Sequence, residues 1–371
     1  MILTNNVIFY ELNYIRQIQK SRNIFQLILT CLRIQPIPLF RRNIIVKFCD
    51  VDMNVAGSVL ELIGNTPMVV LHEVNVNEGV SVLAKLEYLN PSGSIKDRIA
   101  RKMIKEAEKS GFLKPGYTIV ESSTGNTGIA LSFVGTLLGY KVLIYETAPG
   151  KMGEERRNIM RSYGAEVHTL SPENLQELRE RSVAGAEVEL PGRQICLDLE
   201  KNDPKVWWAR QFSNQHNVKA HNDTGREILQ QVGGDVDVFV ASIGTGGTLM
   251  GIAEVLKEFN DNIKIVGVQP ASSAIQMTPG VSYPRSEIKG GIVSDMIEAP
   301  GLIDEVITVS DEEAVRMTLR LWREEGLFAG VSSGANVLIA LREAGRLGKG
   351  KVVTVLPDSG DRYLTDMHYI T

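Results

Sequence analysis

Short runs of β-branched and other apolar residues alternate with longer amphipathic segments along most of this chain. The runs lie at residues 82–86, 117–121, 141–145, 194–197, 237–242, 263–268 and 351–356. The main amphipathic segments lie at residues 99–109, 129–138, 154–163, 312–324 and 335–345. Strands that alternate with helices in this way form parallel sheets covered by helices on both faces. The pattern therefore predicts an α/β fold.

Length and composition favour about two compact units preceded by an extension. A chain of 371 residues, 43% of them hydrophobic, can bury a sizeable core. Residues 1–54 are more basic than the rest, and their longest apolar stretch, residues 25–32, is far too short to span a bilayer. They also lack a secretory cleavage pattern. We expect an accessory extension, or a start codon at Met53; a membrane- or partner-binding role is the alternative.

Net charge and the placement of cysteine and histidine exclude several function classes. A formal charge of −4 gives no positive field, so a general nucleic-acid binder is not expected. The three cysteines are far apart, which argues against a disulfide framework and suits a reducing cytoplasm. The five histidines are scattered and have no acid or cysteine at ligand spacing, so we expect no metal. Small-molecule chemistry fits better.

A lysine at the start of a helix is the first candidate for catalysis. Residues 91–98 form a turn that places Lys96 at the beginning of the amphipathic segment. The helix dipole and the unpaired backbone N–H groups there favour a neutral amine. A neutral amine can form an imine with an aldehyde. The alternative is one more solvated charge on an amphipathic helix.

Two loops rich in glycine and hydroxyl groups follow predicted strands. Residues 121–128 run from a strand through Ser123, Thr124 and Thr127 into an apolar helix, so backbone N–H groups and hydroxyls there can hold a carboxylate. A capping cluster is the alternative interpretation. Residues 244–248 open a second helix, and their glycines let the backbone approach an anion closely, which suits a terminal phosphate.

The second loop also has a rival interpretation as a dinucleotide fingerprint. Gly244, Gly246 and Gly251 have a similar spacing, but the next strand ends in Gln269 rather than the acid that would hold a ribose. This disfavours a nicotinamide oxidoreductase. No Gly-Lys-Ser or Gly-Lys-Thr is present at the loop, so an ATP-type P-loop is absent as well.

Five segments together resemble the cysteine synthases, the O-acetylserine and O-phosphoserine sulfhydrylases. The segments are residues 62–67, 91–98, 124–128, 244–248 and 330–335, in order from about Val55 to the C-terminus. These enzymes belong to the β-family, or fold type II, of pyridoxal-phosphate enzymes. The resemblance implies two three-layer α/β subdomains with mainly parallel sheets, similar to the tryptophan synthase β chain. Residues 55–90 plus 214–371 would form the larger, cofactor-phosphate-binding subdomain, and residues 91–213 the smaller, mobile one. A homodimer is also implied.

Carried over by motif, the resemblance implies a role for each candidate residue. Lys96 would form the internal Schiff base with pyridoxal 5′-phosphate, Asn126 would bind the ring hydroxyl, and Ser332 would face the pyridine nitrogen. The phosphate would be held by Gly244, Thr245, Gly246, Gly247 and Thr248, and the substrate carboxylate by Ser123, Thr124, Thr127 and Gln211.

The implied reaction is a β-replacement. O-acetylserine or O-phosphoserine would lose its activated group to give an α-aminoacrylate, and sulfide would add to make L-cysteine. A serine hydroxyl opposite the pyridine nitrogen does not keep that nitrogen protonated, which favours leaving-group expulsion over transamination. The alternatives on the same fold are a cystathionine β-synthase, a cysteine lyase and a serine/threonine dehydratase. A catalytically silent binding protein is a further alternative.

This chain departs from the family pattern at a few positions. Thr124 replaces the usual serine but keeps the hydroxyl, and Gln215 replaces the usual proline. Residues 284–292 align poorly with the substrate-entrance segment and lack the paired arginines of some phosphoserine-using relatives. Arg285 or Lys289 could still bind a phosphate leaving group, with solvated surface charges as the alternative. The sequence therefore leaves the donor open.

Overall fold

A computed structural model describes residues 55–146, 153–170, 190–271 and 301–364. The contacts of the chain divide it into two units, Met1–Val55 and Ala56–Thr371, and all helices and strands described below belong to the second. The predicted extension and the predicted donor region at residues 284–292 lie outside the described residues. Among the residues described, no helix combines the length and the apolar character needed to cross a membrane.

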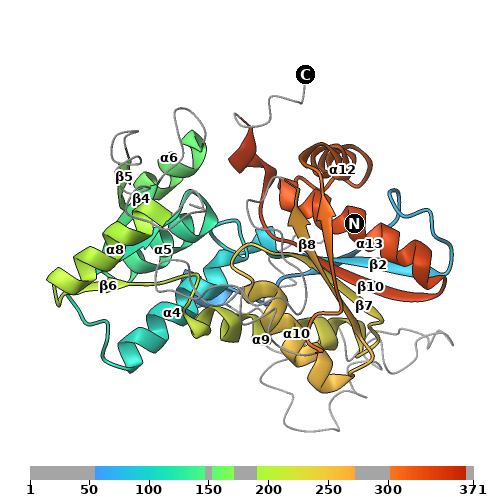
Figure 1. Cartoon of the computed structure of the whole chain (residues 1–371), viewed down its shortest axis with the longest axis horizontal. Coiled ribbons are helices and arrows are strands. Elements are labelled where there is room, and N and C mark those ends of the chain that lie inside the picture. The colour runs from blue at the N-terminus through green and yellow to red at the C-terminus, as the bar shows by residue number, and fades with distance from the viewer. Residues whose placement is uncertain (1–54, 147–152, 171–189, 272–300, 365–371) are drawn as a thin grey trace, which may run out of the picture. The chain divides into compact units, whose positions relative to one another are not determined.

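The second unit contains a six-stranded sheet built from both ends of its sequence. The strands follow the order β1-β2-β10-β7-β8-β9, and each neighbouring pair is parallel except β1 with β2 (Figure 1). Their bounds are β1 Met68–Leu71, β2 Val80–Leu86, β7 Val238–Ser242, β8 Lys264–Pro270, β9 Glu305–Val309 and β10 Gly350–Leu356.

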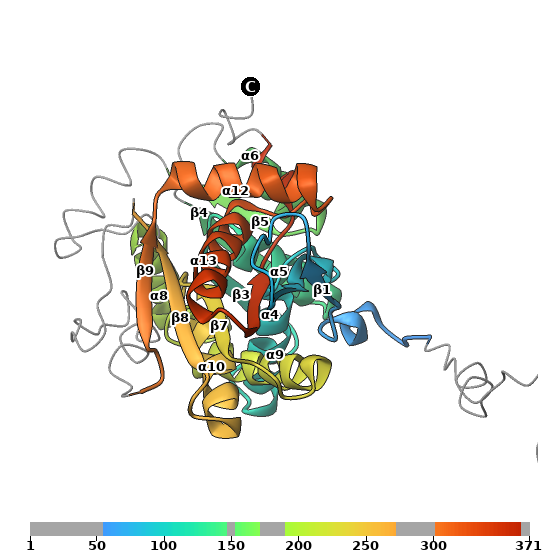
Figure 2. The ribbon, with the colours of Figure 1, turned by 90° about the vertical axis from the view of Figure 1, so that its right-hand side faces the viewer.

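Helices cover both faces of this sheet because its central strands are buried on both sides. In β7, Val238 and Val240 pack in one apolar cluster with α12 and α13, whereas Phe239 and Ala241 pack in another with α9 and α10. This period of two is that of an extended strand. Figure 2 shows the two helix pairs on opposite sides of β7. The helices are α9 Gln215–Val232, α10 Gly247–Phe259, α12 Asp311–Glu324 and α13 Val331–Leu347.

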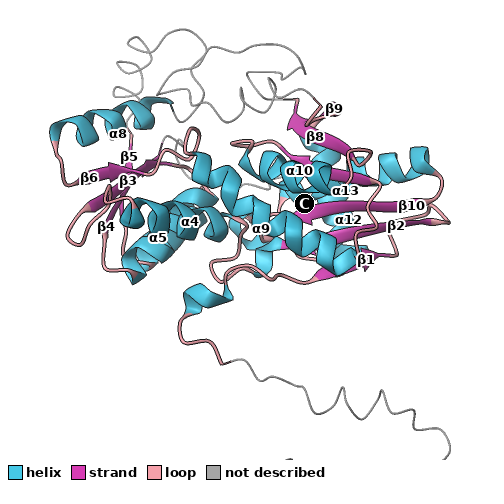
Figure 3. Cartoon of the chain, turned by 90° about the horizontal axis from the view of Figure 1, so that it is seen from below, coloured by secondary structure: helices cyan, strands magenta, loops and turns pink. Residues whose placement is uncertain are grey.

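A four-stranded parallel sheet forms from the middle of the sequence, in the order β5-β4-β3-β6. Ile119 of β3 packs with α4, α5 and α6, and the next residue, Val120, packs with α8 on the other face. Figure 3 shows α8 across this sheet from α4 and α5. The elements are α4 Lys96–Lys109, β3 Thr118–Ser122, α5 Asn126–Leu137, β4 Lys141–Glu146, α6 Glu154–Ser162, β5 Glu166–Thr169, α8 Leu190–Asn202 and β6 Val206–Trp208. Three short 3-10 helices complete the described elements: η1 Val59–Leu62, η2 Glu87–Leu89 and η3 Gly360–Tyr363.

The predicted fold class, two three-layer α/β arrangements with mainly parallel sheets, is confirmed. The predicted strand at residues 194–197 is wrong, because these residues lie inside α8. Pro191 near the helix start and buried residues at helical spacing, Arg193 with Cys196 and Leu197, explain why this short apolar run is helical. The predicted boundaries at residues 90 and 213, and the mobility of the smaller part, stay predictions.

Candidate active site

Three loops meet at one edge of the six-stranded sheet because their strands are parallel. Leu356 at the end of β10 pairs with Leu86 at the end of β2, and Thr354 pairs with Val240 near the end of β7. The segments that follow these ends are the turn before Lys96, residues 244–248, and the segment that contains Asp358. The carboxyl edge of an open parallel sheet is where such folds bind ligands.

Lys96 is the first residue of α4, as the sequence predicts. The side chain is half-buried, and burial is the main cause of its lowered pKa, while the charges of Asp358 and Glu87 act in the opposite direction. The sequence predicts a neutral amine from the helix dipole, and the structure adds desolvation by burial as a cause. A lysine with a lowered pKa supplies more free amine near neutral pH.

The loop at residues 244–248 has the form of an anion cradle. Gly246 has a φ of +88° and caps α10, whose first-turn N–H groups point out of the helix start. A Cβ on Gly244 would meet no atom within 4 Å, so this backbone faces open space. A Cβ on Gly247 would lie 2.1 Å from Asn217 Oδ1, so only glycine fits there.

In the loop at residues 123–127, one side-chain oxygen forms hydrogen bonds within the loop itself. Ser123 Oγ accepts hydrogen bonds from the N–H groups of Gly125 (3.3 Å) and Gly128 (3.0 Å). The capping interpretation therefore holds for this oxygen, and its own proton is left to donate to a ligand. Gly125 faces open space in the same way as Gly244. The loop thus presents backbone and hydroxyl donors on an open side.

Gln211 lies beside this loop, although it is far from it in sequence. Thr127 Oγ1 donates to Gln211 Oε1 at 2.6 Å, and Gln211 Nε2 donates to Ser122 O at 2.9 Å. Asn217 on α9 connects the group to the phosphate loop, since its Nδ2 donates to Gln211 O and to Thr245 Oγ1. The structure therefore brings the predicted carboxylate residues and the predicted phosphate residues together.

Asp358 joins three of the predicted segments, and it is not among the site residues predicted from the sequence. The carboxylate is 1% exposed, and its Oδ2 accepts hydrogen bonds from Asn126 Nδ2 and Tyr363 Oη, both at 2.5 Å. Its backbone bridges Ser94, and its carbonyl accepts from Gly330 N at 2.9 Å. An acid placed directly after a strand, at the carboxyl edge of the sheet, was the signal that would have identified it.

Two arginines also form hydrogen bonds among these loops, and neither was predicted from the sequence. Arg362 donates to Asn126 Oδ1 and to Ser92 O, and a Cβ on Gly93 would lie 2.6 Å from its guanidinium. Arg156 of α6 donates to Thr124 O and to Arg362 O, both at 3.1 Å. These contacts link the lysine turn and the carboxylate loop to the C-terminal part of the larger sheet.

Ser332 is the second residue of α13, whose N-cap residue is Gly330. Its neighbour Ser333 is fully buried, and Ser333 Oγ has no hydrogen-bond partner among the described residues. Because Gly330 contacts Asp358, this turn belongs to the same group of loops. The role of Ser332 toward a pyridine nitrogen stays a prediction.

The residues present fit a pyridoxal-phosphate cofactor. Residues 244–248 offer backbone N–H donors and two threonine hydroxyls for a phosphate, and Lys96 offers an amine for an aldehyde. Buried Asp358 Oδ1 and Ser333 Oγ lack partners among the described residues, and Gly125 and Gly244 face open space. Within the same residues, no three His, Cys, Asp or Glu side chains form a metal-binding group.

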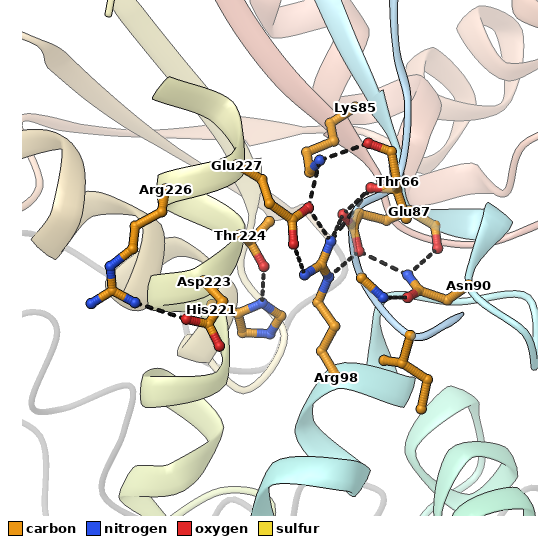
Figure 4. Close-up of polar contacts among 12 residues, drawn as sticks. Thr66, Lys85, Glu87, Asn90, Arg98, His221, Asp223, Thr224, Arg226 and Glu227 are labelled. Carbon is orange, nitrogen blue, oxygen red and sulfur yellow. Dashed lines mark hydrogen bonds and ion pairs between the residues drawn. The ribbon is translucent and has the colours of Figure 1, made fainter. Parts of the chain in front are cut away.

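A buried charge cluster holds the lysine helix against α9 and the larger sheet. Figure 4 shows the guanidinium of Arg98 between the carboxylates of Glu87 and Glu227. The four nitrogen–oxygen distances are 2.7–2.8 Å, and Lys85 lies 2.8 Å from Glu227 on its other side. Glu87 also accepts from Thr66 Oγ1 and Asn90 Nδ2, so both of its oxygens are used. Arg98 is two residues after Lys96, so this cluster fixes the start of α4.

The cluster contains two cations and two anions, so their formal charges cancel. Burial alone would raise the pKa of Glu227, but the hydrogen bonds and charges of Arg98 and Lys85 lower it to about 2. For Lys85 burial has the larger effect, and its pKa is lowered despite Glu227 and Glu87. Since the folded pKa of Glu227 is depressed, its stabilisation is complete above about pH 4.5 and is lost as pH falls toward 2.

We predict that Glu227→Gln lowers the free energy of unfolding by roughly 3 kcal/mol at pH 7, because it leaves two buried cations with Glu87 as the single counter-charge of the cluster. The deficit should shrink as pH falls from about 4.5 to about 2, where the wild-type carboxylate is also neutral. Urea unfolding at several pH values measures both effects. Glu312→Gln is the control, since Glu312 pairs with Arg316 at the surface, and it should change little. An equal loss in both variants would contradict the account.

Comparison with known proteins identifies the family of this chain. Residues 59–358 match the family model described as pyridoxal-phosphate dependent enzyme. A cysteine synthase from Staphylococcus aureus is 40% identical over 317 residues, which cover 84% of this chain and 96% of that protein. The crystal structure of a cysteine synthase from Entamoeba histolytica has a TM-score of 0.73 at 35% identity, covering 86% of this chain and 93% of that one.

A crystal structure of an O-acetylserine dependent cystathionine β-synthase from Helicobacter pylori is also similar. Its TM-score is 0.73 at 33% identity, and the match covers 86% of this chain and 100% of that chain. The predicted resemblance is therefore confirmed over nearly the whole length of these relatives. The chain belongs to the pyridoxal-phosphate dependent enzymes, in the cysteine synthase group.

Proposed function

We propose that this enzyme makes L-cysteine from an O-activated serine and sulfide, with pyridoxal phosphate as its cofactor. The observation that carries the proposal is the position of Lys96, a half-buried lysine of lowered pKa at the same strand edge as the glycine loop 244–248. The cofactor, when bound, supplies the electron sink for a carbanion at the substrate α-carbon. The remaining tasks fall to side chains and backbone groups of this chain.

Four parts of the site would hold the cofactor. Lys96 Nζ would bind its aldehyde carbon, and the N–H groups and threonine hydroxyls of residues 244–248 would bind its phosphate. Asn126 would contact the ring hydroxyl, and Ser332 would face the pyridine nitrogen. Asn126 Oδ1 accepts from Arg362 and one Nδ2 proton goes to Asp358, so the second Nδ2 proton is available for this contact.

Lys96 would also transfer the proton. Once the substrate amine has replaced it, the free amine takes the α-proton as a general base and later returns it to the product. Burial favours the neutral amine that starts this step, and the nearby charge of Asp358 favours the ammonium that results. Burial is the larger effect, and by lowering the pKa it brings the two forms closer in free energy near neutral pH, which favours an efficient base.

Ser123, Thr124, Thr127 and Gln211 would bind the substrate carboxylate. The support is that Gln211 lies beside the loop, within hydrogen-bond distance of Thr127, and that the backbone at Gly125 faces open space. Because the Thr127 hydroxyl donates to Gln211, Thr127 would bind the carboxylate through its backbone N–H. A carboxylate held at the start of α5 gains from the N-terminal end of the helix dipole. Closure of the smaller part over this loop would exclude water from the reacting group.

The assembly and location belong to the same proposal. We propose a homodimer in the cytoplasm, in line with the sulfhydrylase resemblance and the scattered cysteines. In the described part of the chain Cys196 is a free, buried thiol, and burial raises its pKa well above the usual range, so it is not a reactive nucleophile.

We predict that borohydride reduction of the purified enzyme fixes the cofactor on Lys96, since an imine carbon is reduced to a stable amine. Peptide mass spectrometry should find the added mass on the peptide that contains Lys96. Lys96→Ala should lose on the order of a thousandfold or more in activity through loss of the base. Lys102→Ala, on the same helix and paired with Glu106, is the control and should keep both label and activity. A label on a different lysine would refute the assignment.

Donor and acceptor are tested by supplying each candidate separately. We expect cysteine to form from sulfide with O-acetylserine or O-phosphoserine, and to form far more slowly with serine, whose hydroxide is a poor leaving group. Chromatographic quantification of cysteine and cystathionine, with sulfide and homocysteine as rival acceptors, gives the ranking. Faster cystathionine formation from homocysteine than cysteine formation from sulfide would favour the cystathionine β-synthase alternative.

We predict a solution mass of twice the 40.9 kDa chain. Sedimentation equilibrium at several concentrations measures it. A monomer at micromolar concentration that retains full activity would refute the proposed dimer.

A further inference from the structure

Helix α9 carries a row of buried polar side chains on the face next to the glycine loop. Asn217, His221 and Thr224 follow one another at helical spacing, and each is 0% exposed. A buried polar group must find its hydrogen-bond partner inside the protein. For Asn217 and His221 the partners include the two threonine hydroxyls of residues 244–248, Thr245 and Thr248.

Asn217 makes the hydroxyl oxygen of Thr245 a hydrogen-bond acceptor. Its Nδ2 donates to Gln211 O at 2.8 Å and to Thr245 Oγ1 at 3.0 Å. A carbonyl oxygen can only accept, so the contact with Gln211 fixes the orientation of the amide. Thr245 Oγ1 therefore accepts, and it also accepts from Gly247 N at 3.4 Å. With both lone pairs used, the hydroxyl proton of Thr245 is free for another acceptor.

His221 contacts the hydroxyl of Thr248, as Asn217 contacts that of Thr245. Its Nε2 lies 3.2 Å from Thr248 Oγ1, and its Nδ1 lies 3.3 Å from Thr224 Oγ1. Burial, with the positive charges of Lys96 and Arg98, lowers the pKa of His221 well below its usual value, so the ring is neutral and has one N–H. If that proton is on Nε2, Thr248 accepts and keeps its own proton free; if it is on Nδ1, the proton of Thr248 is used on the ring.

We propose that Asn217 and His221 are positioning residues that make Thr245 and Thr248 hydrogen-bond donors toward the cofactor phosphate, with the proton of His221 on Nε2. A phosphate dianion offers only acceptors, so a hydroxyl binds it well only when its proton is free to point outward. No lysine or arginine lies within residues 244–248, so within this loop the two hydroxyl protons and the backbone N–H groups are the donors for a phosphate. The inference rests on the proposed phosphate site and identifies what prepares that site.

The variants that test it remove or keep one donor at a time. His221→Leu removes the donor to Thr248, while His221→Gln can place an amide N–H close to the position of Nε2. Asn217→Asp turns the donor to Thr245 into an acceptor at nearly the same shape. We expect the cofactor dissociation constant to rise on the order of tenfold in His221→Leu and Asn217→Asp, as for one lost hydrogen bond to a charged group. His221→Gln should stay within about threefold of wild type.

Asn222→Asp is the matched control on the same helix. Asn222 donates to Gly251 O and to Glu254, away from the glycine loop, and its substitution should leave the dissociation constant unchanged. The readouts are cofactor titration of the apoenzyme by absorbance and the ³¹P chemical shift of the bound phosphate. The shift should move in His221→Leu and Asn217→Asp only. Unchanged constants and shifts in both variants would overturn the inference.

The protonation of His221 is measured directly in the wild-type holoenzyme, so the test does not depend on any variant folding. Nitrogen NMR of histidine-labelled protein, with the resonance identified by its loss in His221→Gln, should show a protonated Nε2 and an unprotonated Nδ1. The opposite tautomer would overturn the proposed orientation. If the wild type binds no cofactor at all, the proposed function fails; if it binds cofactor and the variants match it, only the role of α9 fails.

Discussion

The position of Lys96, the proposed catalytic residue, depends on the way Arg98 shares its guanidinium between two carboxylates. Glu87 follows β2 of the larger sheet, and Glu227 lies on α9. Arg98 itself is in the first turns of α4, so one planar group fixes three elements relative to one another. A bidentate arginine is suited to this because its donors form a rigid fork. A lysine at this position could not make both paired contacts.

The buried charges around the site and the burial itself affect the pKa of Lys96 in opposite directions. The formal charges of the Arg98 cluster cancel, but its Glu87 carboxylate still raises the pKa of Lys96; burial is the larger effect and lowers that pKa. Asp358 supplies a nearby negative charge at the opposite side, together with contacts to Asn126 and the start of α13. His221 remains neutral next to Lys96 and Arg98, which allows it to act as a hydrogen-bond partner rather than as a charge. The site thus combines a lysine of lowered pKa with neutral donors for an anion.

The features that sequence could predict were those with a local physical signature. The apolar runs of β7, β8 and β10 are buried on both faces, so their composition alone identifies them. The Lys96 turn and residues 244–248 are recognisable because glycine and a helix start follow a strand. Residues 194–197 were misassigned because a short apolar run fits a strand and a buried helix equally well, and its flanking residues decided for the helix.

The residues that sequence missed act through long-range contacts. Asp358 and Arg362 acquire their roles only when segments more than two hundred residues apart meet, and no local pattern encodes those partners. Asn217 contacts Thr245 on a different element, 28 residues along the chain. His221 is a further example, since a lone histidine on a helix gives no indication of its partner on another helix. Helical spacing of polar residues at 217, 221 and 224 was the available signal, and a buried polar stripe of this kind indicates a partner loop.

The central claim is that one chain segment holds the aldehyde of the cofactor and a distant glycine loop holds its phosphate. The most direct measurement is the electron density of a crystal of the enzyme with its cofactor. The account predicts continuous density from Lys96 Nζ to the aldehyde carbon, with the phosphate against residues 244–248 and the pyridine nitrogen near Ser332. An amine of Lys96 in bulk solvent, or a phosphate bound elsewhere, would contradict it.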